Sequence, residues 1–271
     1  MFPGMIHRIL CSAALFGLMA LPSVAETQDD VLSARVLPGW KAADGHYMAA
    51  ISLTLAPGWH TYWRSPGDVG IPPVFDWSAS ENLKSVALHW PSPEVILQNG
   101  SASIGYVGGL TLPVEAVPLD PSQPVHLAVK MNLGICDDIC LPAELDLRAT
   151  LSGPGGPDSL ISAALKAGPI SGKDAGVTGV ACDVTPIEDG LRVTARLKLP
   201  PQGASETVVI EAAEPGIWVS SASTDRQGKA LTASADLVPP AGQPFALDRS
   251  GLVVTVLAQG RSVELHGCPA P

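Results

Sequence analysis

Short apolar runs of strand length recur along most of the chain, between turns that contain glycine and proline. In one of them Ile51, Leu53 and Leu55 alternate with Ser52 and Thr54, which is the pattern of an antiparallel strand with one buried face. Helical periodicity is scarce. Seven such runs within about 125 residues predict an immunoglobulin-like β-sandwich. The predicted strands are residues 31–37, 46–55, 73–77, 85–90, 110–116, 125–133 and 145–151.

A glycine- and proline-rich stretch, LSGPGGP at 151–157, separates this set from the rest of the chain. Residues 158–167 then predict a short helix, because Asp158 or Ser159 can cap it and an apolar stripe follows. That stripe is Leu160, Ile161, Ala164 and Leu165. Strand-like runs resume at 191–199, 207–212, 216–221, 229–237 and 251–258.

The expected fold is therefore all-β, with two immunoglobulin-like β-sandwich domains joined by a Gly/Pro-rich connector with a short helix. The expected bounds are 26–152 for the first domain, 153–179 for the connector and 180–271 for the second domain.

Residues 1–25 have the pattern of a cleavable signal peptide. Arg8 precedes an apolar run, and small residues at Ser23 and Ala25 fit cleavage before Glu26. The run of about 13 residues is short for a membrane span, which needs roughly 20. An uncleaved anchor is the alternative. No later run approaches that length, so we expect no stable membrane insertion after cleavage.

The charge of the chain is acidic. Sixteen basic and 26 acidic residues give a net charge of −10, and loss of Arg8 with the signal peptide makes it about −11. This balance argues against binding to nucleic acid or to anionic membrane surfaces.

Four cysteines remain once Cys11 leaves with the signal peptide: Cys136, Cys140, Cys182 and Cys268. They permit three disulfide connectivities. Proximity favours Cys136–Cys140 and, by elimination, Cys182–Cys268. In the chain-entropy treatment the first bridge stabilises by about 2 kcal/mol and the second by about 4.6 kcal/mol. We therefore expect Cys182–Cys268 to be a structural disulfide. Cys136–Cys140 would add little to the stability of the fold.

The close pair Cys136/Cys140 lies between a strand-like run and Pro142, in the segment GICDDICLP. A weak bridge in an exposed turn suits thiol–disulfide exchange, which needs one accessible sulfur and a second sulfur near enough to resolve the mixed disulfide. A static disulfide and a metal site are the alternatives. Asp137 and Asp138 disfavour thiolate formation beside them, or simply hold a turn.

Other chemistry finds little support in the sequence. Cu(I) binding with Met131 or His126 is weakened because Met131 fits a strand core, and no zinc-ligand spacing occurs. The nucleophile elbow, the phosphate-binding glycine loop and the dinucleotide fingerprint are absent. We therefore expect no cofactor and no metal. The aromatic stretch GWHTYWR at 58–64 is either a recognition surface or core around a bend.

Several stretches, in order, resemble one family. They are PGWHTYWRSPGDVGIPPVFDW (57–77), WPSP (90–93), Gly105-Tyr106 with LTLPV (110–114), LGICDDICLP (133–142) and VELHGCP (263–269). The chain resembles the N-terminal periplasmic domain of DsbD-type thiol:disulfide interchange proteins, and in particular the ScsB branch, the copper-sensitivity suppressors.

The resemblance implies that Cys136 and Cys140 are the redox pair, with Tyr62 close to them and Cys140 as the attacking cysteine. The family's aromatic cap residue has no counterpart at 98–103, where Ile104 or Tyr106 is the nearest substitute. The implied location is the periplasm. The implied partners are a membrane-embedded thiol reductant and periplasmic thioredoxin-fold proteins, with this chain as a stand-alone protein-disulfide reductase component. The alternative is a non-catalytic periplasmic binding module, in copper handling or envelope assembly, with structural disulfides.

Overall fold

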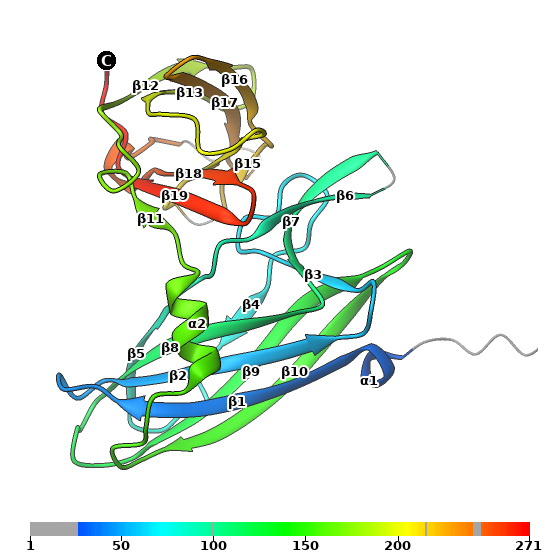
Figure 1. The fold of residues 1–271 in the computed structure, drawn as a ribbon, viewed down its shortest axis with the longest axis vertical. Coiled ribbons are helices and arrows are strands. Elements are labelled where there is room, and N and C mark those ends of the chain that lie inside the picture. The colour runs from blue at the N-terminus through cyan, green and yellow to red at the C-terminus, as the bar shows by residue number, and fades with distance from the viewer. Residues whose placement is uncertain (1–26, 99, 215, 241–244) are drawn as a thin grey trace, which may run out of the picture.

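The structure is a computed structural model that describes residues 27–98, 100–214, 216–240 and 245–271 (Figure 1). The predicted signal peptide, residues 1–25, lies outside these described residues. Within the described ranges, every helix is too short or too polar to cross a membrane.

Two antiparallel sheets form the N-terminal sandwich, which follows the short helix α1 (Gln28–Val31). One sheet has the order β1 (Leu32–Lys41), β2 (Tyr47–Leu55), β8 (Gly109–Pro118) and β5 (Leu83–Leu88). The other has the order β10 (Cys140–Leu151), β9 (Val125–Cys136), β3 (His60–Tyr62), β7 (Ser101–Val107) and β6 (Glu94–Gln98). The short strand β4 (Val74–Asp76) also pairs with β9.

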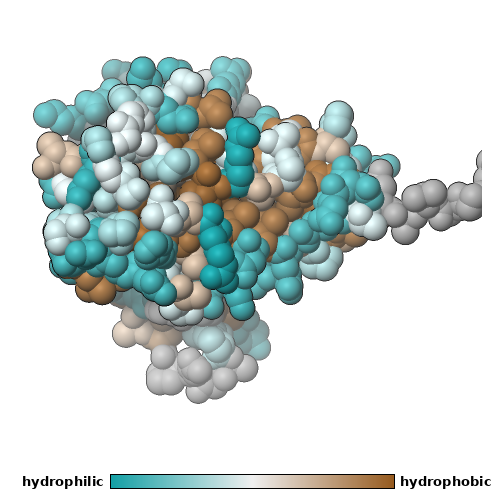
Figure 2. Space-filling view, turned by 90° about the horizontal axis from the view of Figure 1, so that it is seen from below, coloured by the Kyte–Doolittle hydropathy of each residue, from teal (hydrophilic) through white to brown (hydrophobic). Residues whose placement is uncertain are grey.

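The apolar faces of these sheets form the N-terminal core. Ile51, Leu112, Met131 and Ile135 are almost fully buried, and the position of Met131 confirms that this residue belongs to the core. Trp59 and Trp63 of the aromatic stretch are buried as well, so this stretch is mainly core. Seen from below in Figure 2, a band of apolar side chains lies between polar ones on that face of the molecule.

The C-terminal sandwich repeats the two-sheet plan. One sheet has the order β11 (Ile170–Ser171), β19 (Arg261–His266), β18 (Val253–Ala258) and β14 (Thr207–Glu211). The other has the order β12 (Gly179–Pro186), β13 (Leu191–Lys198), β17 (Ala230–Val238) and β15 (Trp218–Val219), with β16 (Ser223–Gln227) paired to β17. A short 3₁₀ helix, η1 (Arg249–Gly251), precedes β18.

The predicted connector helix is present as α2 (Ser159–Lys166). Asp158 caps it by accepting hydrogen bonds from the amides of Leu160 and Ile161. Ile161 is fully buried, and the helix lies across the sheet that contains β1, β2 and β8 (Figure 1). Leu160, expected in the apolar stripe, is largely exposed instead.

Polar and apolar contacts join the two sandwiches. The Arg64 guanidinium makes two 2.9 Å hydrogen bonds to the Glu211 carboxylate and one of 2.6 Å to Glu264. Val209 and Leu257, from strands of the C-terminal sandwich, pack into the N-terminal core. The sandwiches therefore meet through a partly buried ion cluster beside an apolar contact.

The predicted all-β, immunoglobulin-like fold class is confirmed, but several element predictions were wrong. Strands β3, β6, β7, β11, β12, β16 and β19 were not predicted. β10 starts at Cys140 rather than at 145, and β9 runs on to Cys136. Strand β3 is only three residues long, and β7 begins with the polar segment SAS, so neither shows a clear apolar pattern.

Candidate redox site

The cysteines of the close pair occupy the facing ends of two paired strands. Cys136 ends β9, Cys140 starts β10, and the two are direct partners in the register. A disulfide joins them, with a Cα–Cα distance of 4.1 Å. The Asp137 amide donates to the Ile139 carbonyl across the turn. The bridge therefore sits at the tip of a tight hairpin.

The two sulfurs differ in their access to solvent. Cys136 is fully buried, whereas Cys140 belongs to the exposed residues of the turn. Exchange requires a thiolate to approach along the line of the S–S bond. An attacker from solvent therefore reaches Cys140 Sγ, and Cys136 becomes the leaving group.

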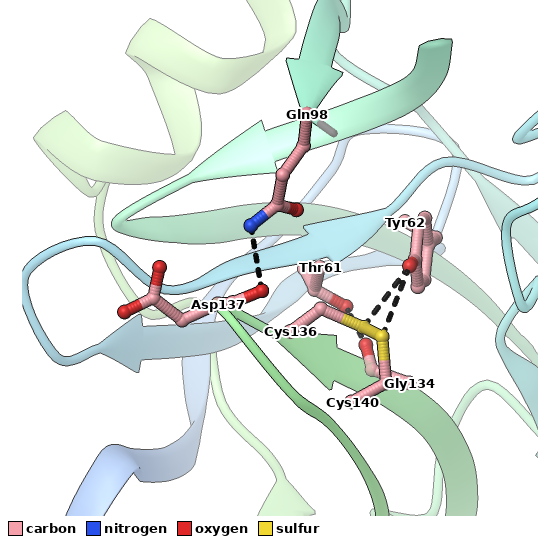
Figure 3. The surroundings of a disulfide bond; sticks show 7 residues. All are labelled: Thr61, Tyr62, Gln98, Gly134, Cys136, Asp137 and Cys140. Atoms are coloured by element: carbon pink, nitrogen blue, oxygen red, sulfur yellow. Dashed lines mark hydrogen bonds between the residues drawn. A yellow bond between two sulfur atoms is a disulfide. The ribbon is translucent and has the colours of Figure 1, made fainter. Parts of the chain in front are cut away.

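The Tyr62 hydroxyl points at the bridge (Figure 3). It lies 3.0 Å from Cys136 Sγ and 3.7 Å from Cys140 Sγ, and it is the donor because disulfide sulfur carries no hydrogen. Burial raises the pKa of Tyr62 above its ordinary value, so the phenol keeps its proton at neutral pH. A hydroxyl donor beside sulfur stabilises a thiolate formed there.

Strand β3 holds Tyr62 in place against β9. His60 pairs with Cys136 and Thr61 with Ile135, and the Thr61 hydroxyl donates to the Gly134 carbonyl at 2.9 Å. A side chain at Gly134 would meet the Tyr62 ring at about 3.0 Å, so glycine there lets the ring approach the strand closely.

His60 is a site residue that the sequence reasoning missed. Its ring packs edge-on against Tyr62, with centroids 5.4 Å apart. Burial lowers the pKa of His60, and the negative charge of Asp137 partly opposes this. The available signal was its position two residues before Tyr62, because residues i and i+2 of a strand share a face.

The hairpin of β6 and β7 reaches the turn from one side. Gln98, at the end of β6, donates its side-chain amide to the Asp137 carbonyl at 2.6 Å (Figure 3). The expected cap loop at 98–103 is therefore the tip of this hairpin, and it contacts the turn through a polar side chain rather than an aromatic one.

Comparison with known protein families gives a match for the part of the chain that holds this site. The family described as "Thiol:disulfide interchange protein DsbD, N-terminal" matches residues 33–152, the segment that holds both sulfurs, Tyr62 and the hairpin. Residues 33–152 form a DsbD-type N-terminal domain. A comparison with curated proteins gave no match.

The DsbD-type domain also has a solved structural relative. The N-terminal periplasmic domain of ScsB from Proteus mirabilis has a TM-score of 0.67 to this chain at 21% sequence identity. The match covers 91% of this chain and 96% of that one. At this identity the likeness shows the fold, and it extends over both sandwiches.

The other predicted site residues have different surroundings. Asp137 and Asp138 form the turn, half-buried and exposed respectively. Tyr106 is directed elsewhere: its hydroxyl donates to the Pro91 carbonyl at 2.8 Å and its ring stacks on Trp90. Cys182 and Cys268 form the second disulfide, and both are buried.

Exposed apolar side chains lie beside the bridge of the DsbD-type domain. Ile139 lies in the turn itself, and the Ile71 side chain lies against Gly134. Their exposed fractions are 54% and 48%. The turn therefore presents an apolar rim, which we define as Ile71 and Ile139.

Proposed function

We propose that this chain is a periplasmic thiol–disulfide exchange protein whose Cys136–Cys140 pair relays electrons. The electrons come from a membrane-embedded thiol reductant and pass to oxidised periplasmic proteins with a thioredoxin fold. The observation that carries the proposal is the asymmetry of the pair, with Cys140 exposed and Cys136 buried against the Tyr62 hydroxyl. The family of residues 33–152 supports the same chemistry.

Reduction of the pair takes two exchange steps. A donor thiolate attacks Cys140 Sγ, the Cys136–Cys140 bond breaks, and Cys136 leaves as a thiolate next to Tyr62. The donor's second thiolate then attacks the donor sulfur of the mixed disulfide. Cys140 leaves as a thiolate, and the donor departs as a disulfide. Two electrons have moved, and the pair takes up two protons as it becomes a dithiol.

Delivery of the electrons reverses the order. The Cys140 thiolate attacks the disulfide of the partner and forms a mixed disulfide. The Cys136 thiolate then attacks Cys140 Sγ, which restores the bridge and releases the partner as a dithiol. Cys140 is thus the residue that meets other proteins, and Cys136 is the resolving residue.

The surroundings of the pair suit controlled exchange. The protonated Tyr62 hydroxyl stabilises Cys136 as a leaving thiolate, which speeds bond cleavage. Asp137 and Asp138 place negative charge beside the turn, which disfavours a free thiolate at Cys140. The pair therefore reacts slowly with small thiols, and a partner that supplies positive charge relieves the restraint.

The apolar rim is the proposed contact surface for both partners. Two exposed aliphatic side chains beside an exposed sulfur offer apolar area that a flat partner surface covers during exchange. The predicted export signal at 1–25 and the buried Cys182–Cys268 disulfide agree with a protein that works in an oxidising compartment.

Trapping of mixed disulfides tests the proposal. In Cys136→Ser the exposed Cys140 remains without its resolving partner, so we expect stable mixed disulfides with thioredoxin-fold proteins of the periplasm. The matched variant Cys140→Ser leaves only the buried Cys136 and is expected to trap none. Equal trapping by both variants, or by neither, would contradict the proposal. Partner binding that needs no cysteine would instead favour a non-catalytic binding module.

A further inference from the structure

Two imidazoles flank one carboxylate at a point remote from the disulfide. His46 Nδ1 lies 2.7 Å from Glu115 Oε1, and His89 Nε2 lies 2.9 Å from Glu115 Oε2. The Asp44 carboxylate approaches the same His46 nitrogen at 3.5 Å. Potential ligand atoms of Asp44, His46 and Glu115 all lie within 4.8 Å of one another.

The sheet register explains why these side chains meet. Glu115 on β8 is the direct partner of Met48 on β2 and of Ala87 on β5. His46 lies two residues before Met48 and His89 two residues after Ala87, so both share the face of Glu115. Three neighbouring strands therefore hold the cluster, while Asp44 comes from the turn between β1 and β2.

We propose that Asp44, His46 and Glu115 bind a divalent transition-metal ion of the zinc class. Imidazole nitrogen and carboxylate oxygen are ligands that Zn²⁺ accepts at about 2.0–2.2 Å, which places neighbouring ligand atoms roughly 3.3 Å apart in a tetrahedral site. The spacings of 2.7 and 3.5 Å around His46 Nδ1 bracket this value. Small shifts of three side chains thus open the site.

His89 has a different place in this site. It binds the Glu115 oxygen that faces away from His46, so it orients the carboxylate while the other oxygen binds the metal. Hydrogen-bonded partners of this kind fix ligand orientation in many metal sites. His89 is therefore a positioning residue rather than a ligand.

The charges and the exposure also suit a cation. Two carboxylates bring two negative charges, and the His46 ring brings a nitrogen ligand. The four side chains are between 28% and 61% exposed, which leaves room for a water as the fourth ligand.

The site is independent of the redox chemistry. Tyr47, next to His46, packs with Val125 at the start of β9, whereas Cys136 ends that strand. A strand of twelve residues spans roughly 36 Å, so the cluster lies at the opposite end of the sandwich from the disulfide. The zinc site and the thiol–disulfide exchange can therefore be tested separately, and a negative result for one does not affect the other.

Zinc titration of the full oxidised chain, with any free thiol alkylated, tests the inference. We expect one Zn²⁺ per chain and at least tenfold weaker binding in His46→Gln and in Glu115→Gln. We expect a smaller loss in His89→Gln. The control His126→Gln changes a histidine of the other sheet, whose ring bonds to Thr150 and not to the cluster, and is expected to bind zinc normally.

Two outcomes would overturn the inference. One is no binding by the original chain at zinc concentrations up to about 1 mM. The other is unchanged binding in both His46→Gln and Glu115→Gln, with circular dichroism confirming that each variant is folded. In either case the cluster is a hydrogen-bonded trio that only ties three strands together.

Discussion

At the scale of single residues, the difference between Cys136 and Cys140 dominates the proposed chemistry. The two positions are only four apart in sequence. Cys136 nevertheless ends the inner strand β9, which is covered by β3, whereas Cys140 starts the edge strand β10. Tyr62 adds to the asymmetry because its hydroxyl is 0.7 Å nearer to the buried sulfur, at 3.0 against 3.7 Å. The buried sulfur is therefore the better stabilised leaving group.

Removal of the Tyr62 hydroxyl should slow the exchange. Tyr62→Phe keeps the ring and loses a hydrogen bond to a thiolate, which is worth about 1.5 kcal/mol or roughly a tenfold lower rate. Stopped-flow reduction by dithiothreitol measures this rate. Tyr106→Phe is the matched control, because its hydroxyl binds Pro91 and not sulfur. Equal rates in Tyr62→Phe and the original protein would remove Tyr62 from the mechanism.

Burial of His60 predicts a pH effect on stability. Because burial lowers the pKa of His60 in the folded protein, the unfolded chain binds the proton more readily. The stabilising contribution is present above the ordinary pKa near 6.5 and is lost as the pH falls through the lowered value. We therefore expect His60→Gln to lose less stability between pH 7 and pH 5 than the original protein, as measured by urea denaturation. A steeper loss in the variant would contradict this.

At the scale of elements, the sequence predicted the strands with strong apolar patterns, including most of β9 and part of β10, and missed β3, β6 and β7 beside the cysteine pair. β2 and β8 were evident because their apolar residues fill the core. β3 has three residues and owes its place to pairing with β7 and β9, which no local pattern reports. The cysteine pair was found from spacing alone, whereas Gln98 and His60 reach the turn only through the three-dimensional arrangement.

The two disulfides should differ in their effect on the elements they join. Cys182–Cys268 ties β12 to the segment after β19 across a separation of 86 residues, whereas Cys136–Cys140 spans 4. Loop-closure entropy therefore predicts losses of about 4.6 and about 2 kcal/mol when each pair is replaced by alanine. Urea denaturation followed by circular dichroism compares the two double variants. A larger loss from the Cys136/Cys140 variant would contradict the division into a structural and a reactive bridge.

At the scale of the whole molecule, Arg64 links the segment that follows β3 to the C-terminal sandwich. It follows Trp63 directly, stacks on its ring at 4.5 Å and binds two glutamates of the other sandwich. Burial acts to lower the pKa of Arg64, but Glu211 and Glu264 raise it overall, so the guanidinium stays charged. The Arg64 cation is therefore one of the contacts that fix the relative position of the sandwiches.

Replacement of Arg64 should loosen the molecule. Arg64→Ala leaves two partly buried carboxylates without their partner, which should cost about 2 kcal/mol, between the values for exposed and buried pairs. Denaturation measures the loss, and small-angle X-ray scattering should show a larger radius of gyration. Arg148→Ala is the control, because its pair with Asp146 is exposed and should contribute little. Similar losses of stability and similar radii of gyration in both variants would show that the Arg64 cluster does not hold the two sandwiches together.

The reduction potential of the Cys136/Cys140 pair decides whether this disulfide is exchange-active or structural. Redox titration of the folded chain, with thiol labelling and mass spectrometry of each cysteine, measures it alongside the buried Cys182–Cys268 bridge as an internal control. We predict a potential above about −300 mV for Cys136/Cys140, within the range of exchange-active dithiols, while Cys182–Cys268 stays oxidised. A potential below about −300 mV for Cys136/Cys140, as in structural disulfides, would contradict it.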